Sequence, residues 1–215
     1  MVKLYFEFTL IFLLVPLLLF LVTPNPVLLF LWIITLICLR ILVKDTSFDR
    51  QNFWRKESIA SFFQPMLIQF LVISLLLSLL LYFLKPESLF LLMREKTLLW
   101  IAILFFYPLF SVYPQEIVYR AFFFHRYQVL FPNQQVMIFV NALIFGYMHI
   151  IFHNWIAVIL AIGGGVLFAS LYAKTHSLAL IFFTHSLYGC MLFTIGLGQF
   201  FYMGTLATIV QTFSF

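Results

Sequence analysis

One acidic side chain stands alone in the second half of this chain. Glu116 is the only Asp or Glu after Glu95, and long apolar runs surround it. An ionised carboxylate costs about 2.5 to 3.5 kcal/mol in the middle of a membrane helix, so Glu116 is a candidate functional group. Arg120 follows one helical turn later, where its guanidinium can pair with the carboxylate. The alternative is a purely structural ion pair between helices, although buried pairs often add little net stability.

The histidines all follow Glu116, and two of them are placed for chemistry. His149 ends the string Phe145 to His149, and His185 lies in the middle of an apolar run. A carboxylate can take a proton from water, while an imidazole can orient that water or stabilise an oxyanion. Glu116, His149 and His185 are therefore the candidate catalytic residues for peptide-bond hydrolysis. The simpler alternative for each histidine is a hydrogen bond to a neighbouring backbone carbonyl.

A metal site is the weaker interpretation of the same residues. His153 follows His149 by four residues, which would place both imidazoles on one helix face at a spacing that suits zinc. Glu116 and His185 could complete the ligands, yet the chain has no H-E-x-x-H motif. The sequence therefore predicts no metal and no other cofactor.

Other polar residues in this half have simpler expected roles. Asn141 lies eight residues before His149 on the same helix face and is expected to form an interhelical hydrogen bond. His125 and Arg126 are expected to extend toward lipid headgroups. His176 is expected to be a loop residue.

The composition indicates a membrane protein. Hydrophobic residues make up 65% of the chain, charged residues 9%, and the mean hydropathy is +1.12, which is outside the range of soluble domains. The apolar runs are continuous rather than alternating, which favours helices over strands. The sequence therefore predicts an all-α fold, a polytopic membrane helical bundle of about eight helical segments.

Apolar runs long enough to cross a bilayer predict where these helices lie. They cover residues 4–22, 27–43, 66–84, 97–112, 135–152, 154–173, 178–197 and 199–213, while a helix at 115–130 is only part apolar and is expected to pack inside the protein. Pro16 is expected to kink the first helix, and Pro114 to separate the fourth from the fifth. Residues 23–26 read as a turn, and Gly163 to Gly165 predict close approach of a neighbouring helix. The long polar stretch from Lys44 to Gln64 is expected at the membrane interface.

One membrane domain fits the whole chain, 1–215. Residues 1–96 supply spans and a cytoplasmic loop, residues 97–197 form the core with the site, and residues 198–215 form a C-terminal helix. The first run lacks a small-residue cleavage site, so it is predicted to be a retained helix rather than a signal peptide. Cys38 and Cys190 lie within apolar runs and predict buried thiols without a disulfide.

Basic residues set the expected topology. Four of them cluster between the second and third spans, at Lys44, Arg50, Arg55 and Lys56. The positive-inside rule places that segment and the N-terminus on the cytoplasmic side, and the expected location is a bacterial cytoplasmic membrane. The net charge of +5 fits contacts with lipid headgroups better than binding to nucleic acid.

Three strings in the second half resemble the CPBP family of intramembrane glutamic endopeptidases, also called the CAAX-protease and bacteriocin-processing (Abi) family. Its members carry E-E-x-x-x-R, F-x-x-x-H and H-x-x-x-N motifs on separate membrane helices. The corresponding strings here run from Gln115 to Arg120, from Phe145 to His149 and from His185 to Gly189. The segment 174–178 is similar to the family's lead-in to the third motif. The resemblance covers about residues 97–197.

The resemblance implies a peptidase in which a Glu and the first His activate water while the second His and an Asn support the oxyanion. Two positions depart from the pattern. Gln115 stands where the first Glu is usual, and an amide cannot act as a general base. Gly189 stands where the Asn is usual and has no side-chain donor. Either Glu116 takes the role of the base, or the chain retains the scaffold without the proteolysis.

Three functions follow from these observations. The favoured one is an intramembrane endopeptidase that cleaves a membrane-associated protein or peptide at the lipid bilayer. The second is a catalytically inactive scaffold or immunity-type binding protein. The third is a small proton-coupled transporter, which is disfavoured because the polar groups lie in one half of the chain and transporters usually show paired halves.

Overall fold

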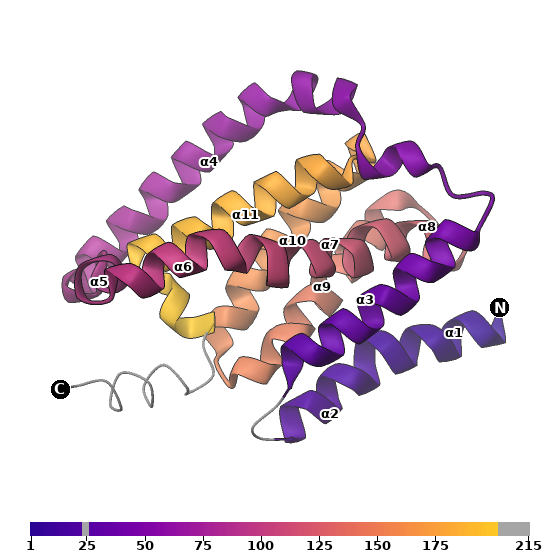
Figure 1. The fold of residues 1–215 in the computed structure, drawn as a ribbon, viewed down its shortest axis with the longest axis horizontal. Helices are drawn as coiled ribbons and strands as arrows, with labels where there is room; N and C mark the ends of the chain where they lie inside the picture. Colours follow the sequence, from indigo (N-terminus) through magenta and orange to yellow (C-terminus); the bar gives the residue numbers. More distant parts are fainter. Residues whose placement is uncertain (23–25, 202–215) are drawn as a thin grey trace.

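The computed structural model describes residues 1–22 and 26–201, apart from the side chains of residues 56–58. All the regular secondary-structure elements in this part of the chain are helices, and Figure 1 shows their arrangement. Among the described residues, seven stretches are long and apolar enough to cross a membrane: Val2–Leu21, Val27–Lys44, Ile59–Leu84, Thr97–Leu130, Gln134–Phe152, Trp155–Thr175 and Leu178–Ile195. The protein is therefore an integral membrane protein, and the predicted all-α helical bundle is confirmed. The predicted turn at 23–26 and the helix at 199–213 lie largely outside the described residues.

The first two spans run side by side. Helices α1 (Val2–Thr9) and α2 (Val15–Leu21) are joined by the π-helical stretch Leu10–Leu14 into one span, and α3 (Val27–Lys44) forms the second. Pro16 lies inside this continuous span, two residues after the π-helical stretch. A 3-10 turn, Arg50–Phe53, then leads into α4 (Lys56–Leu84). The predicted interfacial segment is thus divided, because its last nine residues already belong to α4.

The longest stretch is Thr97–Leu130, which follows the short helix α5 (Leu91–Glu95). It consists of α6 (Thr97–Tyr107), a π-helical stretch Pro108–Val112, α7 (Tyr113–Glu116), a second π-helical stretch Ile117–Phe122, α8 (Phe123–Tyr127) and a last 3-10 turn Gln128–Leu130. The predicted break at Pro114 is therefore wrong, since the helix continues through the proline.

Helix α3 explains why Pro114 does not end this stretch. Pro114 has no N–H to donate to the carbonyl of Phe110, four residues earlier. That carbonyl instead accepts a hydrogen bond from Trp32 Nε1 at 3.1 Å. The carbonyl of Pro114 accepts from the Thr35 hydroxyl at 3.2 Å. A neighbouring helix thus satisfies backbone groups that the proline disturbs, as membrane helices with internal prolines require.

Three helices complete the described chain. They are α9 (Gln134–Met148), which continues into a 3-10 turn His149–Phe152, then α10 (Trp155–Thr175) and α11 (Leu178–Ile195), followed by a 3-10 turn Leu197–Phe201. Each begins at a side-chain cap: Asn133, Asn154 and Ser177 accept hydrogen bonds from backbone N–H groups two or three residues later.

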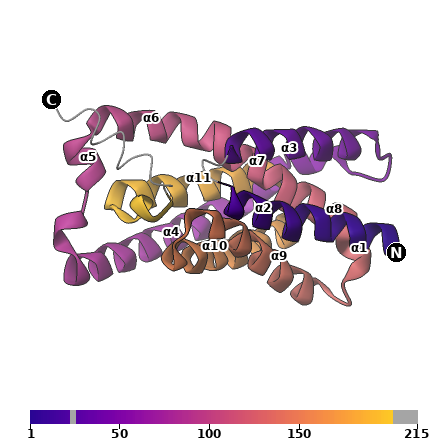
Figure 2. The same cartoon turned by 90° about the horizontal axis from the view of Figure 1, so that it is seen from below.

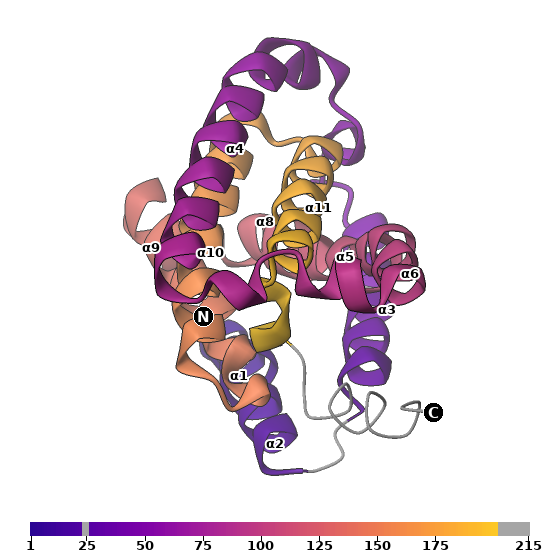
Figure 3. The ribbon, with the colours of Figure 1, turned by 90° about the vertical axis from the view of Figure 1, so that its left-hand side faces the viewer.

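Helix α11 lies at the centre of the molecule. Figures 2 and 3 show it between α4 and α10 on one side and α6 on the other. Buried residues make up 67% of its apolar window, against 6% for α4, which faces outward. Helices α1 to α3 lie beside the α7–α8 end of the long stretch (Figure 2). Side chains on α11 are therefore shielded from lipid by the helices around them.

Candidate active site

The second π-helical stretch holds the buried ion pair. Glu116 ends α7 and Arg120 lies within Ile117–Phe122. Both side chains are completely buried, and Arg120 Nε lies 3.4 Å from Glu116 Oε2. π-Helical turns within α-helices occur frequently at functional sites. The pairing predicted from the four-residue spacing is therefore present, inside protein rather than against lipid.

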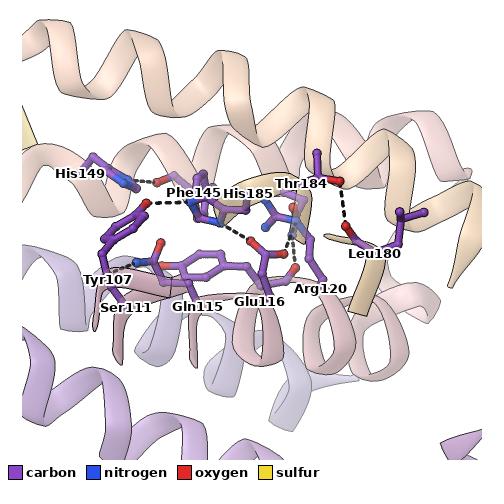
Figure 4. A network of polar contacts seen from close by, with 12 residues as sticks. Tyr107, Ser111, Gln115, Glu116, Arg120, Phe145, His149, Leu180, Thr184 and His185 are labelled. Atoms are coloured by element: carbon purple, nitrogen blue, oxygen red, sulfur yellow. Dashed lines mark hydrogen bonds and ion pairs between the residues drawn. The ribbon is translucent and has the colours of Figure 1, made fainter. Parts of the chain in front are cut away.

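Glu116 also binds His185 on α11. Glu116 Oε1 lies 2.7 Å from His185 Nδ1, and His185 Nε2 lies 3.3 Å from the Tyr107 hydroxyl (Figure 4). Phe168 stacks on the His185 ring, with 4.5 Å between ring centroids. A polar chain thus runs from Arg120 through Glu116 and His185 to Tyr107, linking the long stretch to the central helix twice.

Aromatic rings surround the Arg120 guanidinium. Its central carbon lies 4.7 Å from the Phe145 ring centroid and 5.8 Å from that of Phe168. Among the described residues, the three guanidinium nitrogens have no hydrogen-bond partner. Glu116 and the two ring faces are therefore what compensates this buried charge.

His149 is oriented by its own helix. Its Nδ1 lies 2.7 Å from the Phe145 carbonyl oxygen, so Nδ1 is the donor and Nε2 retains a lone pair. The rings of His149 and His185 both contact Phe145, with centroid distances of 5.0 and 5.6 Å. The two imidazoles therefore approach one another across a single aromatic side chain.

A cavity of about 1500 Å³ opens beside these imidazoles. Its walls are mostly aliphatic and aromatic residues from α3, α4, α6 and α9 to α11. The polar residues that line it are Tyr107, Ser111, Gln115, Tyr119, His149, His153, His185 and Tyr188. In the described part of the chain, Glu116 and Arg120 do not line it. Glu116 therefore reaches the cavity only through His185, whereas the sequence suggested that it would meet water directly.

Gln115 and Glu116 point to different surroundings. Gln115 lines the cavity, and its Nε2 donates a hydrogen bond to Ser111 Oγ at 2.8 Å. Its neighbour Glu116 points toward His185 and Arg120 (Figure 4). The position that faces the cavity is thus occupied by a neutral amide.

His153 does not join His149 in a helical pair. The helix tightens to a 3-10 turn at His149–Phe152, and His153 adopts a left-handed backbone conformation with φ of 53°. Its ring stacks on Phe20 of α2 at 4.4 Å. Within residues 1–22 and 26–201, no group of three or more His, Cys, Asp or Glu side chains is placed to hold a metal. The geometry therefore gives no support to the metal alternative.

Asn141 connects α9 to the π-helical stretch. It is completely buried, and its Nδ2 donates to the carbonyl of Tyr119 at 2.7 Å. Tyr119 immediately precedes Arg120, so this bond helps to fix the backbone that carries the ion pair. Asn141 therefore contacts the backbone next to the ion pair and does not line the cavity.

Two residues expected at lipid headgroups have protein partners instead. His125 Nε2 lies 2.9 Å from Asp45 Oδ2. Arg126 donates two hydrogen bonds to Glu7, each 3.0 Å long. These contacts tie α8 to α1 and to the end of α3. The Cys38 thiol is buried as predicted, whereas Cys190 is only half-buried.

Sequence reasoning missed Tyr107 and Ser111. Both lie in an apolar helix before the first motif string, where one tyrosine and one serine attract little notice. Their spacing held a signal, because Ser111 lies four and Tyr107 eight residues before Gln115, on one helix face. That face is the one that lines the cavity.

The comparison with known families agrees with the motif strings. The family model for the Rce1-like proteins, described as type II CAAX prenyl endopeptidases, matches residues 95–191. No curated protein and no solved structure matches the chain. The matched segment contains all three motif strings and every polar residue of the Arg120–Glu116–His185–Tyr107 chain. Residues 95–191, a little under half of the chain, thus match the Rce1-like family of type II CAAX prenyl endopeptidases, and this match supports the resemblance to the CAAX-protease family.

Proposed function

We propose that this protein is an intramembrane endopeptidase that hydrolyses a peptide bond of a membrane-associated protein or peptide. The observation that carries the proposal is the placement of two imidazoles from different helices against one cavity, with a buried carboxylate behind one of them. The family match over residues 95–191 supports the same class of reaction.

His149 is the proposed general base. Its Nδ1 is engaged by the Phe145 carbonyl, which leaves the Nε2 lone pair available to a water in the cavity. Glu116 does not line the cavity, and Gln115 cannot accept the proton. The Gln115 amide is placed to hold the water by a hydrogen bond. His149 thus takes the role that a carboxylate at position 115 would share.

His185 provides the positive side of the site. The Glu116 carboxylate, 2.7 Å from Nδ1, accepts a hydrogen bond from that nitrogen and holds the ring in place. When the ring carries both protons, Nε2–H is donated to the Tyr107 hydroxyl at the cavity wall, and the positive charge lies on the side where negative charge develops on the carbonyl oxygen. Fixed donors of this kind commonly supply the largest share of catalysis in acyl transfer.

The proposed reaction is a water attack in two stages. A proton leaves the water for His149 Nε2 while the water oxygen bonds to the carbonyl carbon, and the C=O π electrons move to the oxygen. The tetrahedral intermediate then re-forms the C=O bond, the C–N bond breaks, and His149 returns its proton to the leaving nitrogen. Both histidines finish in their initial states.

The cavity suggests a lipid-modified substrate. Its volume of about 1500 Å³ exceeds that of most ligand pockets, and most of its wall is apolar. The name of the matched family refers to prenyl endopeptidases. We therefore propose a peptide whose prenyl group occupies the apolar part of the cavity while the scissile bond lies between His149 and His185.

The test is cleavage by the purified protein in liposomes that contain membrane-anchored peptides with and without a prenyl group. We expect His149→Ala and His185→Ala each to lower kcat by roughly 100-fold or more. His176→Asn is the matched control, since His176 lies in a left-handed position outside the cavity that Asn tolerates. Full activity in His149→Ala would contradict the proposed base.

The competing interpretation, an inactive scaffold, has its own outcome in the same assay. Gln115→Glu places a carboxylate at the cavity wall beside His149. A wild-type protein that cleaves no peptide, together with a Gln115→Glu variant that does, would favour the scaffold. Faster cleavage by Gln115→Glu than by an already active wild type is the result that we expect.

A further inference from the structure

Tyr107 places a hydroxyl group at the centre of the candidate site. It is the last residue of α6 and lines the cavity. Its Oη lies 3.3 Å from His185 Nε2, and its ring packs edge-on against Phe193 at 5.3 Å (Figure 4 shows the phenol beside His185). The residue precedes all three motif strings, so none of them assigns it a role.

Gly189 leaves the space that this phenol occupies. Gly189 lies one helical turn after His185 on α11. A Cβ at position 189 would lie 2.6 Å from Tyr107 Cζ and closer still to Cε1 and Oη. A side chain at 189 and the ring of Tyr107 therefore exclude one another. The chain has a glycine at 189, and the donor group in that volume comes from α6.

We propose that Tyr107 is a catalytic residue whose O–H donates a hydrogen bond to the carbonyl oxygen of the scissile bond as that oxygen becomes an oxyanion. This inference rests on the proposed function. It also accounts for Gly189, the position that has no donor of its own, because the phenol supplies one in the same place.

The direction of the polar chain supports the assignment. When the His185 ring carries both protons, Nδ1–H faces Glu116 and Nε2–H is donated to Tyr107 Oη. The phenol proton then points away from His185, and Tyr107 lines the cavity into which it can point. A hydroxyl that accepts a hydrogen bond becomes a better donor, since hydrogen bonds in series polarise one another. Tyr107 keeps its proton throughout and forms no covalent bond.

The first test is Tyr107→Phe, which removes the hydroxyl and retains the ring. We expect kcat to fall by roughly 100- to 1000-fold with KM nearly unchanged, as for other lost oxyanion donors. Tyr113→Phe is the matched control, because Tyr113 lies on the same helical stretch, is exposed and does not line the cavity. A structural role for the ring alone would leave kcat of Tyr107→Phe close to that of the wild type.

The second test exchanges the two positions. Tyr107→Ala empties the volume beside Gly189, and the additional change Gly189→Asn places an amide donor there. We expect kcat of the double variant to be at least about 10-fold higher than that of Tyr107→Ala. This recovery is no larger than the loss that removal of one oxyanion donor causes. Gly189→Asn alone should lose activity, because the new side chain meets the Tyr107 ring. If the double variant binds substrate but does not recover kcat, the result argues against Tyr107 as the donor.

The outcomes separate this inference from the proposed function. A wild type that cleaves no substrate overturns both, whereas an active wild type whose Tyr107→Phe variant retains full kcat overturns the role of Tyr107 alone. Nitrogen-15 NMR of the His185 ring provides a readout that does not need activity. The Nε2 resonance should shift in Tyr107→Phe and stay in place in Tyr113→Phe. An unmoved resonance in Tyr107→Phe would also overturn the inference.

Discussion

Glu116 and Arg120 form a charge pair that neither lipid nor water touches. Both are fully buried, and the Arg120 nitrogens have no hydrogen-bond partner in the described residues. Attraction within such a pair roughly offsets the cost of removing both charges from water. The pair therefore contributes little net stability, while the loss of either partner leaves the other charge uncompensated.

This imbalance predicts a large effect of Glu116→Gln. We expect the free energy of unfolding to fall by about 3 to 5 kcal/mol, because Arg120 would remain as a buried, unpaired cation. Chemical denaturation in detergent micelles measures the change. The double variant Glu116→Gln/Arg120→Met removes both charges and should recover most of the stability. A double variant no more stable than Glu116→Gln would contradict this account of the pair.

The sequence predicted this pair but not the position of its carboxylate. The spacing of Glu116 and Arg120 is local, and a helix of any surroundings brings the two together. The contact between Glu116 and His185 spans 69 residues and depends on how α11 enters the bundle. No local pattern shows which of Gln115 and Glu116 faces the cavity. Tyr107 was missed for the same reason, since its partners all lie beyond residue 180.

At the scale of helices, the π-helical stretch Ile117–Phe122 depends on support from α9. Asn141 donates its hydrogen bond to a carbonyl of this stretch, at Tyr119. We expect Asn141→Ala to lower the free energy of unfolding by about 1 to 3 kcal/mol, because that buried carbonyl loses its partner. We also expect a lower kcat, because the same backbone carries Arg120.

A matched control for Asn141 lies on the same helix. Gln134 Nε2 donates to the carbonyl of Ala173 at 3.2 Å, in a part-buried position where water can replace it. Gln134→Ala should therefore change both the stability and the cleavage rate less than Asn141→Ala. Equal effects of the two variants would show that Asn141 has no special influence on the site.

Helices α9 and α10 pack closely, and one glycine of the predicted triplet accounts for it. A Cβ at Gly165 would lie 2.9 Å from the Ala142 Cα and 3.1 Å from its carbonyl oxygen, whereas a Cβ at Gly163 would meet nothing within 4 Å. We expect Gly165→Ala to destabilise the fold by about 1 to 3 kcal/mol through overpacking. Gly163→Ala should stabilise it by about 0.5 to 1 kcal/mol. Thermal unfolding of the pair compares them directly, and equal shifts would contradict the packing argument.

The helices themselves were largely predictable, because membrane spans are continuous apolar runs. The predicted break at Pro114 was wrong because of contacts with another helix. Proline ends helices in isolation, but Trp32 and Thr35 on α3 satisfy the carbonyls around Pro114. A sequence pattern indicates how much a proline destabilises its own helix. It does not show a compensating hydrogen bond from a span some 80 residues earlier in the chain.

For the molecule as a whole, polar contacts tie the end of α3 and the last turn of α1 to α8. Among them, hydrogen bonds from Ser47 and then from His125 hold the pKa of the Asp45 carboxyl well below its usual range. The stabilisation is complete above the pKa of Asp45 in the unfolded chain, about 3.9. It is lost as the pH falls from there toward the lower pKa of the folded state.

The protonation of Asp45 therefore predicts how the stability of the fold decreases at acidic pH. The melting temperature should fall below about pH 4, and it should fall less steeply in Asp45→Asn, which has no carboxylate to protonate. Glu87→Gln, a change at an exposed carboxylate, should follow the wild type. Thermal unfolding between neutral and strongly acidic pH measures the difference. Superimposable profiles for wild type and Asp45→Asn would contradict the prediction.

The apolar wall of the cavity, to which α3, α4 and α6 contribute, also determines how a reaction rate on this protein has to be measured. A substrate anchored in the bilayer is diluted by neighbouring lipids and detergents rather than by buffer. Added lipid or detergent competes with the substrate for the apolar wall of the cavity. The turnover rate should therefore follow the mole fraction of substrate in the membrane. Doubling the amount of lipid at constant bulk concentration should then halve an unsaturated rate.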